Sequence, residues 1–594
     1  MSVFKSLLAA VGVLTVLSCP FFSASATPSG GYLDRSVKDV PPLAVIDGGA
    51  AVDLAPVPAN AMLAAEESLP ASYRSNDYGY ITPAKSQQDT NACWAFSAIA
   101  CAEADAIKNH GFAKDTDFSE WALAYFQFYG VTDPLGLLAG DYLTLTNNYM
   151  MTSSNLFLTA QSLSNWRGIH AEEEAPLAHV MGNHEAGLPP ELCYNDVLHL
   201  ENAYLLPTKT DSDRAAVKAS IRQFGAASAG IYYNEIYLNS ANAAYYNGSV
   251  LNANHAVTLV GWDDHYSRLN FSASSRPAKD GAWLVKNSWG TAFGNGGLFW
   301  VSYYDISLCS EDVTVLDFAP ADNFDRNYQY DGAPGFATLT FQNGSTSVAA
   351  VFTAEGDEQL EAASLFHYAD SATAYTLNVY KNPSSANPAS GTKVATVSGT
   401  FPTAGLYTVR LASPVELQKG DRFSAVFSLS CDVGLRATIC IPGEYLQSDG
   451  SLIAYNSGQA GQGFYLQKGK WRDLYTDYNA SPRLHAYTVL KSAPVPSSTT
   501  TETTTATTTL APSTTDTATT APTVAPSGSA ADDGLWGDAN ADGAVNMKDV
   551  LAVRKAIAGL APVASEQNAD VTPDGVINMK DVLVLRKFLA GLPF

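Results

Sequence analysis

The sequence predicts a multidomain protein in which an α+β domain, an all-β sandwich, a disordered linker and a small all-α module follow one another. Three observations support this fold class. The chain has 594 residues, several times the usual size of one domain. Its hydrophobic pattern changes from mixed helix and strand periods to short strands alone, and its last segment contains an internal repeat. We therefore expect several separate hydrophobic cores.

The charge balance argues against nucleic-acid binding. The chain carries 58 Asp and Glu residues against 34 Lys and Arg residues, and this formal net charge of −24 repels phosphate backbones. Seven cysteines in so long a chain do not make the dense disulfide framework of small secreted scaffolds. The domains must therefore fold on their own cores.

The first 26 residues have the pattern of an export signal. Lys5 gives a positive start, Leu7–Leu17 is apolar, and Ala24–Ala26 forms a small-residue cleavage site. The alternative is a lipoprotein signal acylated at Cys19, but the Ala-Ser-Ala site explains more of the segment. No later stretch has the roughly 18 uninterrupted apolar residues of a membrane-spanning helix. We expect an exported, soluble protein without a transmembrane anchor.

Changes in composition divide the rest of the chain. The leader is rich in Ala, Pro, Val and Asp without periodicity, and residues 497–530 hold fifteen threonines among Ala, Pro and Ser, too little apolar material to order a core. The predicted segments are a signal peptide (1–26), a leader or short pro-segment (27–68), the α+β domain (69–318), the sandwich (319–491), the linker (492–532) and the terminal module (533–594).

Local patterns justify the elements of the first two domains. Residues 94–106 are dominated by Ala and contain no Gly or Pro, so they predict a helix with Cys93 at its N-terminus. Residues 256–262 and 282–286 are β-branched and aromatic and predict strands. Short strand patterns separated by turns then indicate the antiparallel sandwich, at residues 347–353, 375–380, 406–411 and 422–429. Within it, Cys431 and Cys440 could close a disulfide, although their spacing alone does not establish one.

The terminal module is a duplication. Residues 538–560 and 570–592 repeat with a period of 32 residues, and each copy has oxygen-bearing side chains at the alternating positions of an EF-hand-type loop, followed by one helical pattern. Two calcium ions are therefore expected. Position 3 of the second loop is Thr572, a weaker ligand. The predicted ligands are Asp538, Asn540, Asp542, Ala544 through its carbonyl, Asn546 and Asp549, then Asp570, Thr572, Asp574, Val576 through its carbonyl, Asn578 and Asp581.

Cys93 is the residue on which the chemical interpretation depends. A thiol at a helix N-terminus is exposed to the positive end of the helix dipole, and a neighbouring imidazolium lowers its pKa further, which produces a reactive thiolate. A lone cysteine is more often a buried structural residue. The surrounding motifs decide in favour of the reactive thiol.

Those motifs occur in a fixed order. Gln87 lies six residues before Cys93, His255 follows 162 residues after it in Asn-His-Ala-Val, and Asn287 lies in Lys-Asn-Ser-Trp-Gly. This set resembles the papain-like (C1 family) cysteine peptidases over about residues 69–304. The matching stretches are Leu69-Pro70, Ile81–Pro83, Cys93–Ser97, Phe118–Glu120, Gly168-Ile169, Asn254–Val257, Lys286–Gly290 and Gly296–Phe299.

The resemblance implies a papain-like catalytic domain and a role for each matched residue. Cys93 would be the nucleophile, His255 the base that forms an ion pair with it, and Asn287 the residue that orients the imidazole. Gln87 would donate to the oxyanion, and Trp289 would shield the bond between Asn287 and His255 from water. No cofactor is expected for catalysis, and the substrate would be a peptide or protein.

Three departures from the family pattern bear on specificity and latency. Thr90–Ala92 replaces the usual Cys-Gly-Ser, so the common disulfide beside the nucleophile is absent. Ser154-Asn155 stands near the place of the Gly-Gly pair that binds the substrate backbone. The leader is also too short for the long inhibitory helical pro-region of many relatives. Substrate preference and activation therefore stay open.

The sandwich is similar to the lectin-like domain that follows papain-like peptidases in some bacterial secreted or surface proteins. The similarity rests on residues 328–332, 350–354, 419–423 and 471–473. It implies a carbohydrate partner, which Tyr328, Tyr330 and Trp471 could contact. Packing in the core is the alternative for these aromatics, and we favour it.

The repeats after a Thr/Pro linker resemble a dockerin, over about residues 535–594. This resemblance implies a cohesin of a cellulosome-type scaffold as partner, and because both repeats carry the same residue types, either could dock. A calcium-stabilised cap without a partner is the alternative. The expected cohesin-facing residues are Met547, Lys548, Arg554, Lys555, Met579, Lys580, Arg586 and Lys587.

Together these features predict a secreted, extracellular cysteine peptidase at the cell surface, attached through its dockerin to a cohesin-bearing scaffold. The alternative is a catalytically silent papain-like protein that binds polypeptide or glycan on the scaffold. A third reading, in which the thiol serves acyl transfer or peptide ligation, uses the same residues.

Overall fold

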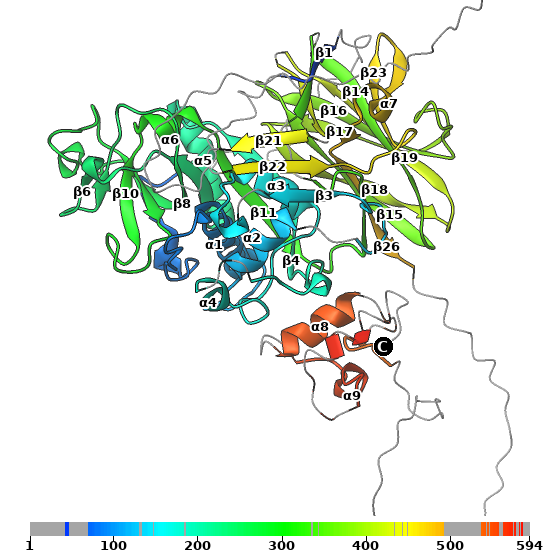
Figure 1. Ribbon diagram of the computed structural model, residues 1–594, viewed down its shortest axis with the longest axis horizontal. Coiled ribbons are helices and arrows are strands. Elements are labelled where there is room, and N and C mark those ends of the chain that lie inside the picture. Colours follow the sequence, from blue (N-terminus) through cyan, green and yellow to red (C-terminus); the bar gives the residue numbers. More distant parts are fainter. Residues whose placement is uncertain are drawn as a thin grey trace, which may run out of the picture.

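The computed structural model describes residues 42–46 and 69–491, except 130–132, 146–147, 183, 185, 334–336, 343, 433, 442 and 448–449, together with parts of 536–588 (Figure 1). It confirms a multidomain fold with an α+β domain, a strand-rich sandwich and a small helical tail module. Within these residues no helix is both long and apolar enough to cross a bilayer. The predicted signal and linker fall outside the described residues.

The helices of the α+β domain pack into one core. Fifteen of the seventeen residues of α1 are buried, which explains why this Ala-rich segment has no polar face. Ser119 caps α2 by accepting from Ala122 N at 3.0 Å, and Asn155 caps α3 by accepting from Leu158 N at 3.0 Å. The helices are α1 (Cys93–Asn109), α2 (Glu120–Phe128), α3 (Leu156–Ser164), α4 (Leu177–Val180), α5 (Asp211–Phe224) and α6 (Ile306–Ser310).

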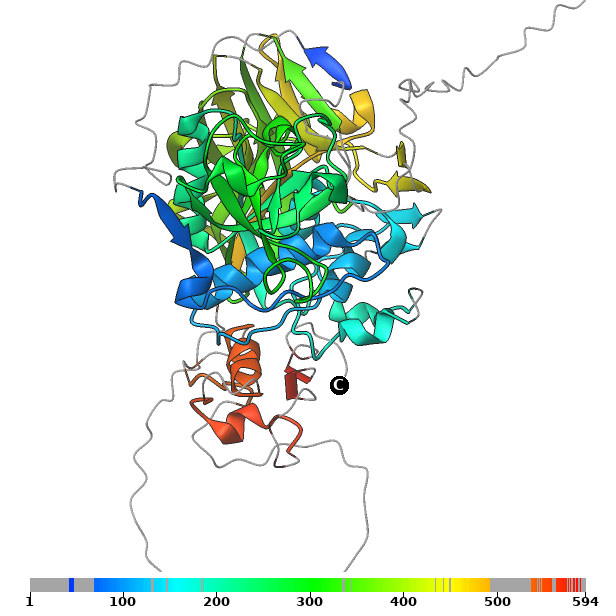
Figure 2. The same ribbon diagram turned by 90° about the vertical axis from the view of Figure 1, so that its left-hand side faces the viewer.

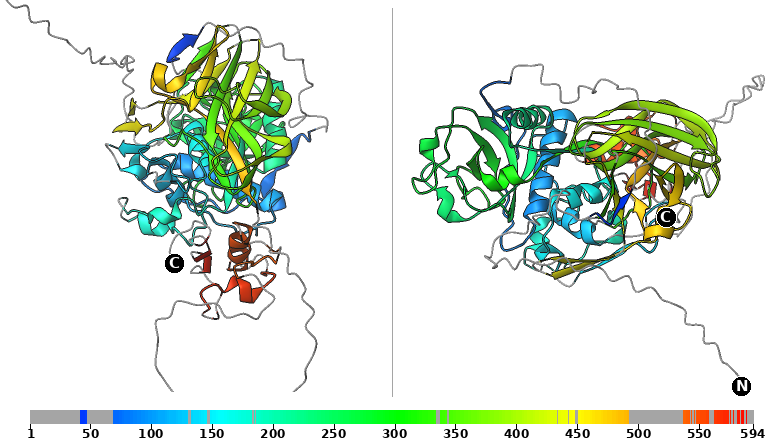
Figure 3. Two further views of the ribbon diagram at one scale, coloured as in Figure 1. Left: turned by 90° about the vertical axis from the view of Figure 1, so that its right-hand side faces the viewer. Right: turned by 90° about the horizontal axis from the view of Figure 1, so that it is seen from above.

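An antiparallel sheet forms the other part of this domain. Strand β8 pairs with β5 and β9, and β9 continues to β10. Figures 1 and 3 show α1 and α2 between these strands and the sandwich. The strands are β2 (Ser72–Arg74), β3 (Tyr142–Leu145), β4 (Leu198–Leu206), β5 (Ala227–Ile231), β6 (Leu238–Asn239), β7 (Ala244–Tyr245), β8 (His255–Asp263), β9 (Ala282–Lys286), β10 (Leu298–Ser302) and β11 (Val313–Pro320).

The predicted strands of the sandwich are all present. One sheet has the order β17-β16-β19-β14-β23-β24, and β15, β18, β20 and β26 belong to the sheet that faces it. The elements are β12 (Arg326–Tyr328), β13 (Ala337–Phe341), β14 (Ser345–Thr353), β15 (Glu358–Tyr368), β16 (Thr373–Lys381), β17 (Thr392–Phe401), β18 (Gly405–Leu417), β19 (Arg422–Ser430), β20 (Arg436–Cys440), β21 (Gly443–Gln447), β22 (Gly450–Tyr455), β23 (Gly463–Gln467), β24 (Lys470–Asp473), α7 (Leu474–Tyr478), β25 (Ser481–Pro482) and β26 (Leu484–Leu490).

The two large domains share backbone pairing, which the sequence did not indicate. Strand β18 of the sandwich pairs with β4, where Gly405 lies opposite Tyr204. Strand β3 of the α+β domain also pairs with β22 of the sandwich. The Asp141 carboxylate accepts from Ser457 N at 2.5 Å and from Gly332 N at 2.9 Å. The domains therefore form a continuous structure and not two separate bodies on a linker. Figure 2 views the molecule from the side of the α+β domain.

The leader contributes one unexpected strand, β1 (Ala44–Ile46). It pairs in parallel with β13 of the sandwich, and Ile46 is buried in the core of that domain while Val45 faces solvent. The aperiodic composition of the leader gave no sign of this strand, because three residues are too few to show a period.

The tail module has its own small core, formed by Val550, Val553, Val582 and Leu585. Its described helices are α8 (Met547–Ile557) and α9 (Glu566–Ala569), and Trp536 packs edge-on against Phe588 at 5.0 Å. Helix α8 begins at Met547, so the last positions of the first predicted calcium loop are already helical.

No disulfide joins any of the cysteines that the structure describes. Cys440 Sγ instead donates to the Ala333 carbonyl at 3.2 Å, and burial raises the Cys440 pKa to about 12. The suggested bridge to Cys431 is therefore not formed in this structure.

Candidate active site

The nucleophile loop, residues 87–92, places Cys93 at the start of α1. Thr90 donates to the Gln87 carbonyl through both N (3.2 Å) and Oγ1 (2.8 Å), and Gln87 Nε2 donates to the Thr90 carbonyl at 2.7 Å. These bonds close a tight turn ahead of the helix. Cys93 is fully buried and begins the helix, where the positive end of the helix dipole favours a thiolate.

His255 and Asn287 meet because of the register of two strands. His255 begins β8 and Asn287 follows the last residue of β9, and Thr258 pairs with Lys286 between them. His255 Nε2 lies 2.8 Å from Asn287 Oδ1, which also accepts from Ser288 N at 2.9 Å. A carbonyl oxygen only accepts, so Nε2 carries the proton and the other ring nitrogen stays available.

Cys93 lies beside the residue that follows His255. The backbone N of Ala256 donates to Cys93 Sγ at 3.4 Å. The structure thus places Cys93 against Ala256, the chain neighbour of His255, and joins His255 to Asn287.

An aromatic cluster covers the imidazole. Trp289 stacks on His255 with ring centroids 4.7 Å apart and planes 19° apart. Tyr233 and Phe293 pack edge-on against the Trp289 ring at 4.5 Å and 5.0 Å. The sequence motif indicated Trp289 but neither of the other two, since Tyr233 carries no motif and Phe293 lies in a loop. His255 and Asn287 are both buried beside this cluster.

Burial controls the charge of His255. It lowers the His255 pKa to about 4, and the bond to Asn287 offsets this effect only in part. The imidazole alone is therefore neutral at neutral pH. An imidazolium in this place requires a nearby negative charge, which a Cys93 thiolate would supply.

Gln87 connects the nucleophile loop to the strand side of the site. Its backbone N donates to the Ser288 carbonyl at 2.8 Å, and its Oε1 accepts from Ser288 Oγ at 2.6 Å. Hydrogen bonds thus hold Oε1 and one N–H of the Gln87 side-chain amide, which fixes its orientation. Its second N–H can donate to an oxyanion. This geometry suits the role expected of Gln87.

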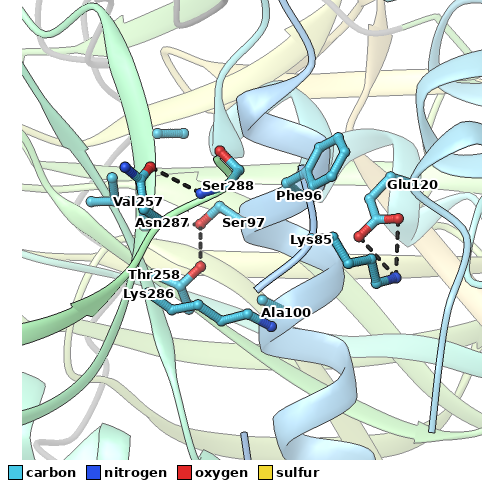
Figure 4. A pocket seen from close by; sticks show the side chains of 11 residues that line it. Lys85, Phe96, Ser97, Ala100, Glu120, Val257, Thr258, Lys286, Asn287 and Ser288 are labelled. Carbon is cyan, nitrogen blue, oxygen red and sulfur yellow. Dashed lines mark hydrogen bonds and ion pairs between the residues drawn. The ribbon is translucent and has the colours of Figure 1, made fainter. Parts of the chain in front are cut away.

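A cluster of charges lies beside the site, and three of its members, Lys85, Glu120 and Lys286, line the pocket that Figure 4 shows. Lys85 Nζ lies 3.0 Å from Glu120 Oε1, 3.3 Å from Glu103 Oε1 and 2.5 Å from Asp117 Oδ1. Lys286, next to Asn287, donates to Thr82 Oγ1 at 2.9 Å. The pocket has a volume of about 10 Å³, roughly what one water needs.

These charges affect one another's protonation. Desolvation raises the Glu120 pKa to about 8, while the carboxylates around Lys85 raise the pKa of that amine above its usual range. Lys85 is therefore charged, and Glu120 binds a proton at higher pH than an ordinary carboxylate does. Sequence reasoning named Phe118–Glu120 only as a motif and missed this network, because no spacing rule links residues 85, 103 and 120.

The aromatics suggested for sugar binding are used mainly in packing. Tyr328 is fully buried and donates to Glu358 Oε1 at 2.6 Å, and Tyr330 donates to the Val351 carbonyl at 3.0 Å. Trp471 packs partly buried beside the strand residues Val351 and Phe464. These contacts agree with the packing alternative.

The described parts of the two tail loops share one geometry. Gly543 N donates to Asp538 Oδ2 at 2.9 Å, and Gly575 N donates to Asp570 Oδ2 at 2.7 Å. Asn540 N and Thr572 N donate in the same way to the Oδ1 atoms of Asp549 and Asp581, at 3.1 Å and 2.9 Å.

Both glycines have positive φ, 86° and 80°, as position 6 of a calcium loop requires. The described residues therefore fit a calcium ion in each loop, although no group of three ligands is complete among them. Asp542, Ala544, Asn546, Asp574, Val576, Asn578, Met579, Lys580, Arg586 and Lys587 lie outside the described residues, as do the side chains of Met547, Arg554 and Lys555; Lys548 is exposed.

Three parts of the chain match known families. Residues 69–125 and 157–315 match the papain family cysteine protease, residues 327–488 the lectin-like domain, and residues 536–590 the dockerin type I domain. These matches agree with the three resemblances found in the sequence.

Individual relatives are distant. Fruit bromelain of Ananas comosus is 25% identical over 236 residues, which cover 39% of this chain and 54% of that protein. Cathepsin K of Mus musculus is 26% identical over 239 residues, covering 39% and 59%. The chain thus spans little more than half the length of these relatives.

Solved structures show the shared fold of the two large domains. The cysteine protease and lectin-like domains of Cwp84, a surface layer associated protein of Clostridium difficile, superpose with a TM-score of 0.57 at 24% identity, covering 75% of this chain and 93% of that one. Clostridial Cwp84 after propeptide cleavage gives the same TM-score at 25% identity, covering 71% and 99%. The chain therefore combines a papain family cysteine protease domain, a lectin-like domain and a dockerin type I domain.

Proposed function

We propose that the protein is a secreted cysteine peptidase that hydrolyses peptide bonds at Cys93. The observation that carries this proposal is the contact geometry around the thiol. Cys93 Sγ accepts from Ala256 N at 3.4 Å, and the neighbouring His255 is held by Asn287 at 2.8 Å. A thiol beside an oriented imidazole is the arrangement that nucleophilic catalysis by cysteine requires.

Each step of the proposed reaction can be assigned to a residue of this site. The Cys93 thiolate adds to the substrate carbonyl carbon, and the Gln87 amide and the Cys93 N–H stabilise the negative charge on the oxygen. Collapse breaks the C–N bond while imidazolium His255 gives its proton to the leaving amine. Water, deprotonated by His255, then attacks the thioester and releases the acid and the thiol. Asn287 keeps the imidazole in the required tautomer throughout.

The tail supports attachment to a scaffold. The match to the dockerin type I domain and the paired loop geometry of Asp538 and Asp570 support a calcium-dependent module that binds a cohesin. The eight residues expected to face the cohesin occur as the same four types in each repeat, so we propose that either repeat docks. This attachment would place the peptidase outside the cell, on a cohesin-bearing surface.

The alternative is a catalytically silent binding protein, and one observation favours it. Cys93 is fully buried, so its thiol is not exposed to a substrate in this structure. A carbohydrate partner for the lectin-like domain belongs to this alternative, and the buried Tyr328 and Tyr330 do not support it.

Labelling with a thiol-directed peptidyl epoxide tests the proposal. In the full chain we expect the label at Cys93 and none at Cys309 or Cys431, the two described cysteines of intermediate exposure; burial raises the pKa of Cys309. Peptide mapping by mass spectrometry locates the label, and Cys93→Ala is the control. A folded protein that is labelled at Cys309 alone, or nowhere, is the silent binder. Product analysis with added amines separates hydrolysis from ligation.

A further inference from the structure

Cys93 lies between two flanks of the α+β domain. On one side β8 brings the Ala256 N–H, next in the chain to His255, to the thiol. On the other side lies the Met150 segment, defined here as residues 149–152, which continues through Ser153 and Ser154 to α3. Ser154-Asn155 stands near the place where papain-like relatives have the glycines that bind the substrate backbone. The position of this segment therefore bears on how a peptide enters the site.

Three successive carbonyls of the Met150 segment accept hydrogen bonds from residues around Cys93. Asn91 N donates to the Met150 carbonyl at 2.9 Å, and Asn91 Nδ2 donates to the Met151 carbonyl at 2.7 Å. Trp94 Nε1 reaches the Thr152 carbonyl at a longer 3.4 Å. Asn91 alone thus supplies the two short contacts, one from its backbone and one from its side chain.

The far side of the Met150 segment is held independently of Asn91. Asn148 accepts from Met150 N at 2.9 Å and donates through Nδ2 to the His184 carbonyl at 2.5 Å. Tyr149 OH donates to the Ala186 carbonyl at 2.5 Å. Loss of the Asn91 amide would therefore free one edge of the segment without unfolding it.

The sequence lacks the usual disulfide at this place, because Thr90–Ala92 replaces the Cys-Gly-Ser that precedes the nucleophile in relatives. Two hydrogen bonds from Asn91 hold this loop and the Met150 segment at close range, and unlike a disulfide they do not depend on redox conditions. This loop therefore lacks the cysteine but carries the Asn91 amide, which bonds it to the Met150 segment.

We propose that Asn91 is a positioning residue that holds the Met150 segment against the nucleophile loop, so that the substrate-binding wall of the site keeps its place without a disulfide. The inference rests on the proposed peptidase function. It does not assign Asn91 any contact with the reacting atoms. It predicts that reactions needing the wall depend on the Asn91 side chain, and that reactions needing only the thiol do not.

Two reagents separate these requirements in the full chain. Iodoacetamide is small and needs only the Cys93 thiol, whereas a peptidyl epoxide must also lie along the wall. Asn91→Asp keeps the shape of the side chain but removes the N–H that donates to Met151. We expect it to slow epoxide labelling about tenfold and iodoacetamide labelling less than about twofold. For a peptide substrate KM should rise while kcat stays within about twofold.

The chain offers a matched control at the other end of α1. Asn109 also donates through Nδ2 to a backbone carbonyl, that of Gln223, at 3.0 Å. Asn109→Ala should leave the ratio of the two labelling rates unchanged. Asn91→Ala replaces the Asp variant if melting shows that the added charge prevents folding, and should give the same ratio.

The outcomes distinguish the inference from the proposed function. Equal loss of both rates in the Asn91 variants would mean a general structural role, and unchanged rates would mean that the amide is dispensable; either result overturns the inference. If Cys93 of the folded wild-type protein reacts with iodoacetamide but not with any peptidyl epoxide, the peptidase proposal fails instead.

Discussion

The candidate active site and the calcium loops of the tail are built in opposite ways. Cys93, His255 and Asn287 come from a helix and two strand ends, and they meet only because the α+β domain folds around them. Each tail loop is a run of twelve consecutive residues whose ends already meet, as Asn540 N does with the Asp549 carboxylate. The comparison teaches that a site spread along the chain depends on its whole domain, whereas a local loop depends on its ion.

The largest expected effect comes from removing the nucleophile. Cys93→Ala should lower peptide hydrolysis by a factor on the order of 10⁴ or more, because no other group can form the acyl intermediate. The tail should still bind calcium. Turnover of a peptide library and a calcium titration measure the two effects, and hydrolysis that persists in the pure variant would place the chemistry elsewhere.

The same variant reports on the charge of His255. Without the thiolate the imidazole should titrate at a pKa of about 4, as burial dictates, and NMR of the ring protons should show a higher pKa in the wild type. Since the folded pKa lies below the unfolded value, His255 stabilises the Cys93→Ala fold above about pH 6.5, and this contribution is lost as the pH falls towards 4. Equal pKa values in both proteins would argue against an ion pair.

Removal of the orienting amide should have a smaller effect on the dispersed site. Asn287→Ala breaks the 2.8 Å bond to His255 Nε2, and we expect kcat/KM to fall by about 10-fold to 100-fold. Asn254→Ala is a matched control, because its amide bonds the backbone of Tyr233 beside the site and not the imidazole. A kcat/KM that is the same in both variants would remove Asn287 from the mechanism.

Chelation of calcium should affect the tail module, and so it tests the comparison between the local calcium loops and the dispersed active site. Removing calcium with EDTA should lower the helical content of the isolated tail, since the carboxylates of each loop then repel one another. Asp538→Ala should abolish the response of the first loop and keep that of the second. Circular dichroism during a calcium titration measures both. A spectrum that does not respond to calcium would contradict the loop assignment.

The smallest expected effect concerns the buried charges beside the site. Because desolvation raises the Glu120 pKa to about 8, the protonated form stabilises the fold at low pH, and this contribution is lost as the pH rises from about 4.5 through 8. Glu120→Gln should remove that slope between pH 5 and 8. Denaturant unfolding at both pH values measures it, with exposed Glu173→Gln as control.

The sequence predicted the positions that carry local signals. The helix after Cys93, the strands at β8 and β9, and the four strand segments of the sandwich all follow from their hydrophobic patterns. The pairing of β18 with β4 and of β1 with β13 did not follow, because backbone pairing between distant segments leaves no trace in the period of either one. Tyr233 and Lys85 were missed at the site because side-chain contacts between distant segments leave no trace in a local pattern either.

What the sequence by itself determined was the order of the domains and the chemical type of each motif, since residue type and spacing are properties of the chain. Only the tertiary structure decided which group donates to Cys93, which aromatics cover His255, and that Asn91 bonds two carbonyls of the Met150 segment. The physical reason is that these contacts join segments far apart in the chain, and each of them forms only when the whole core packs.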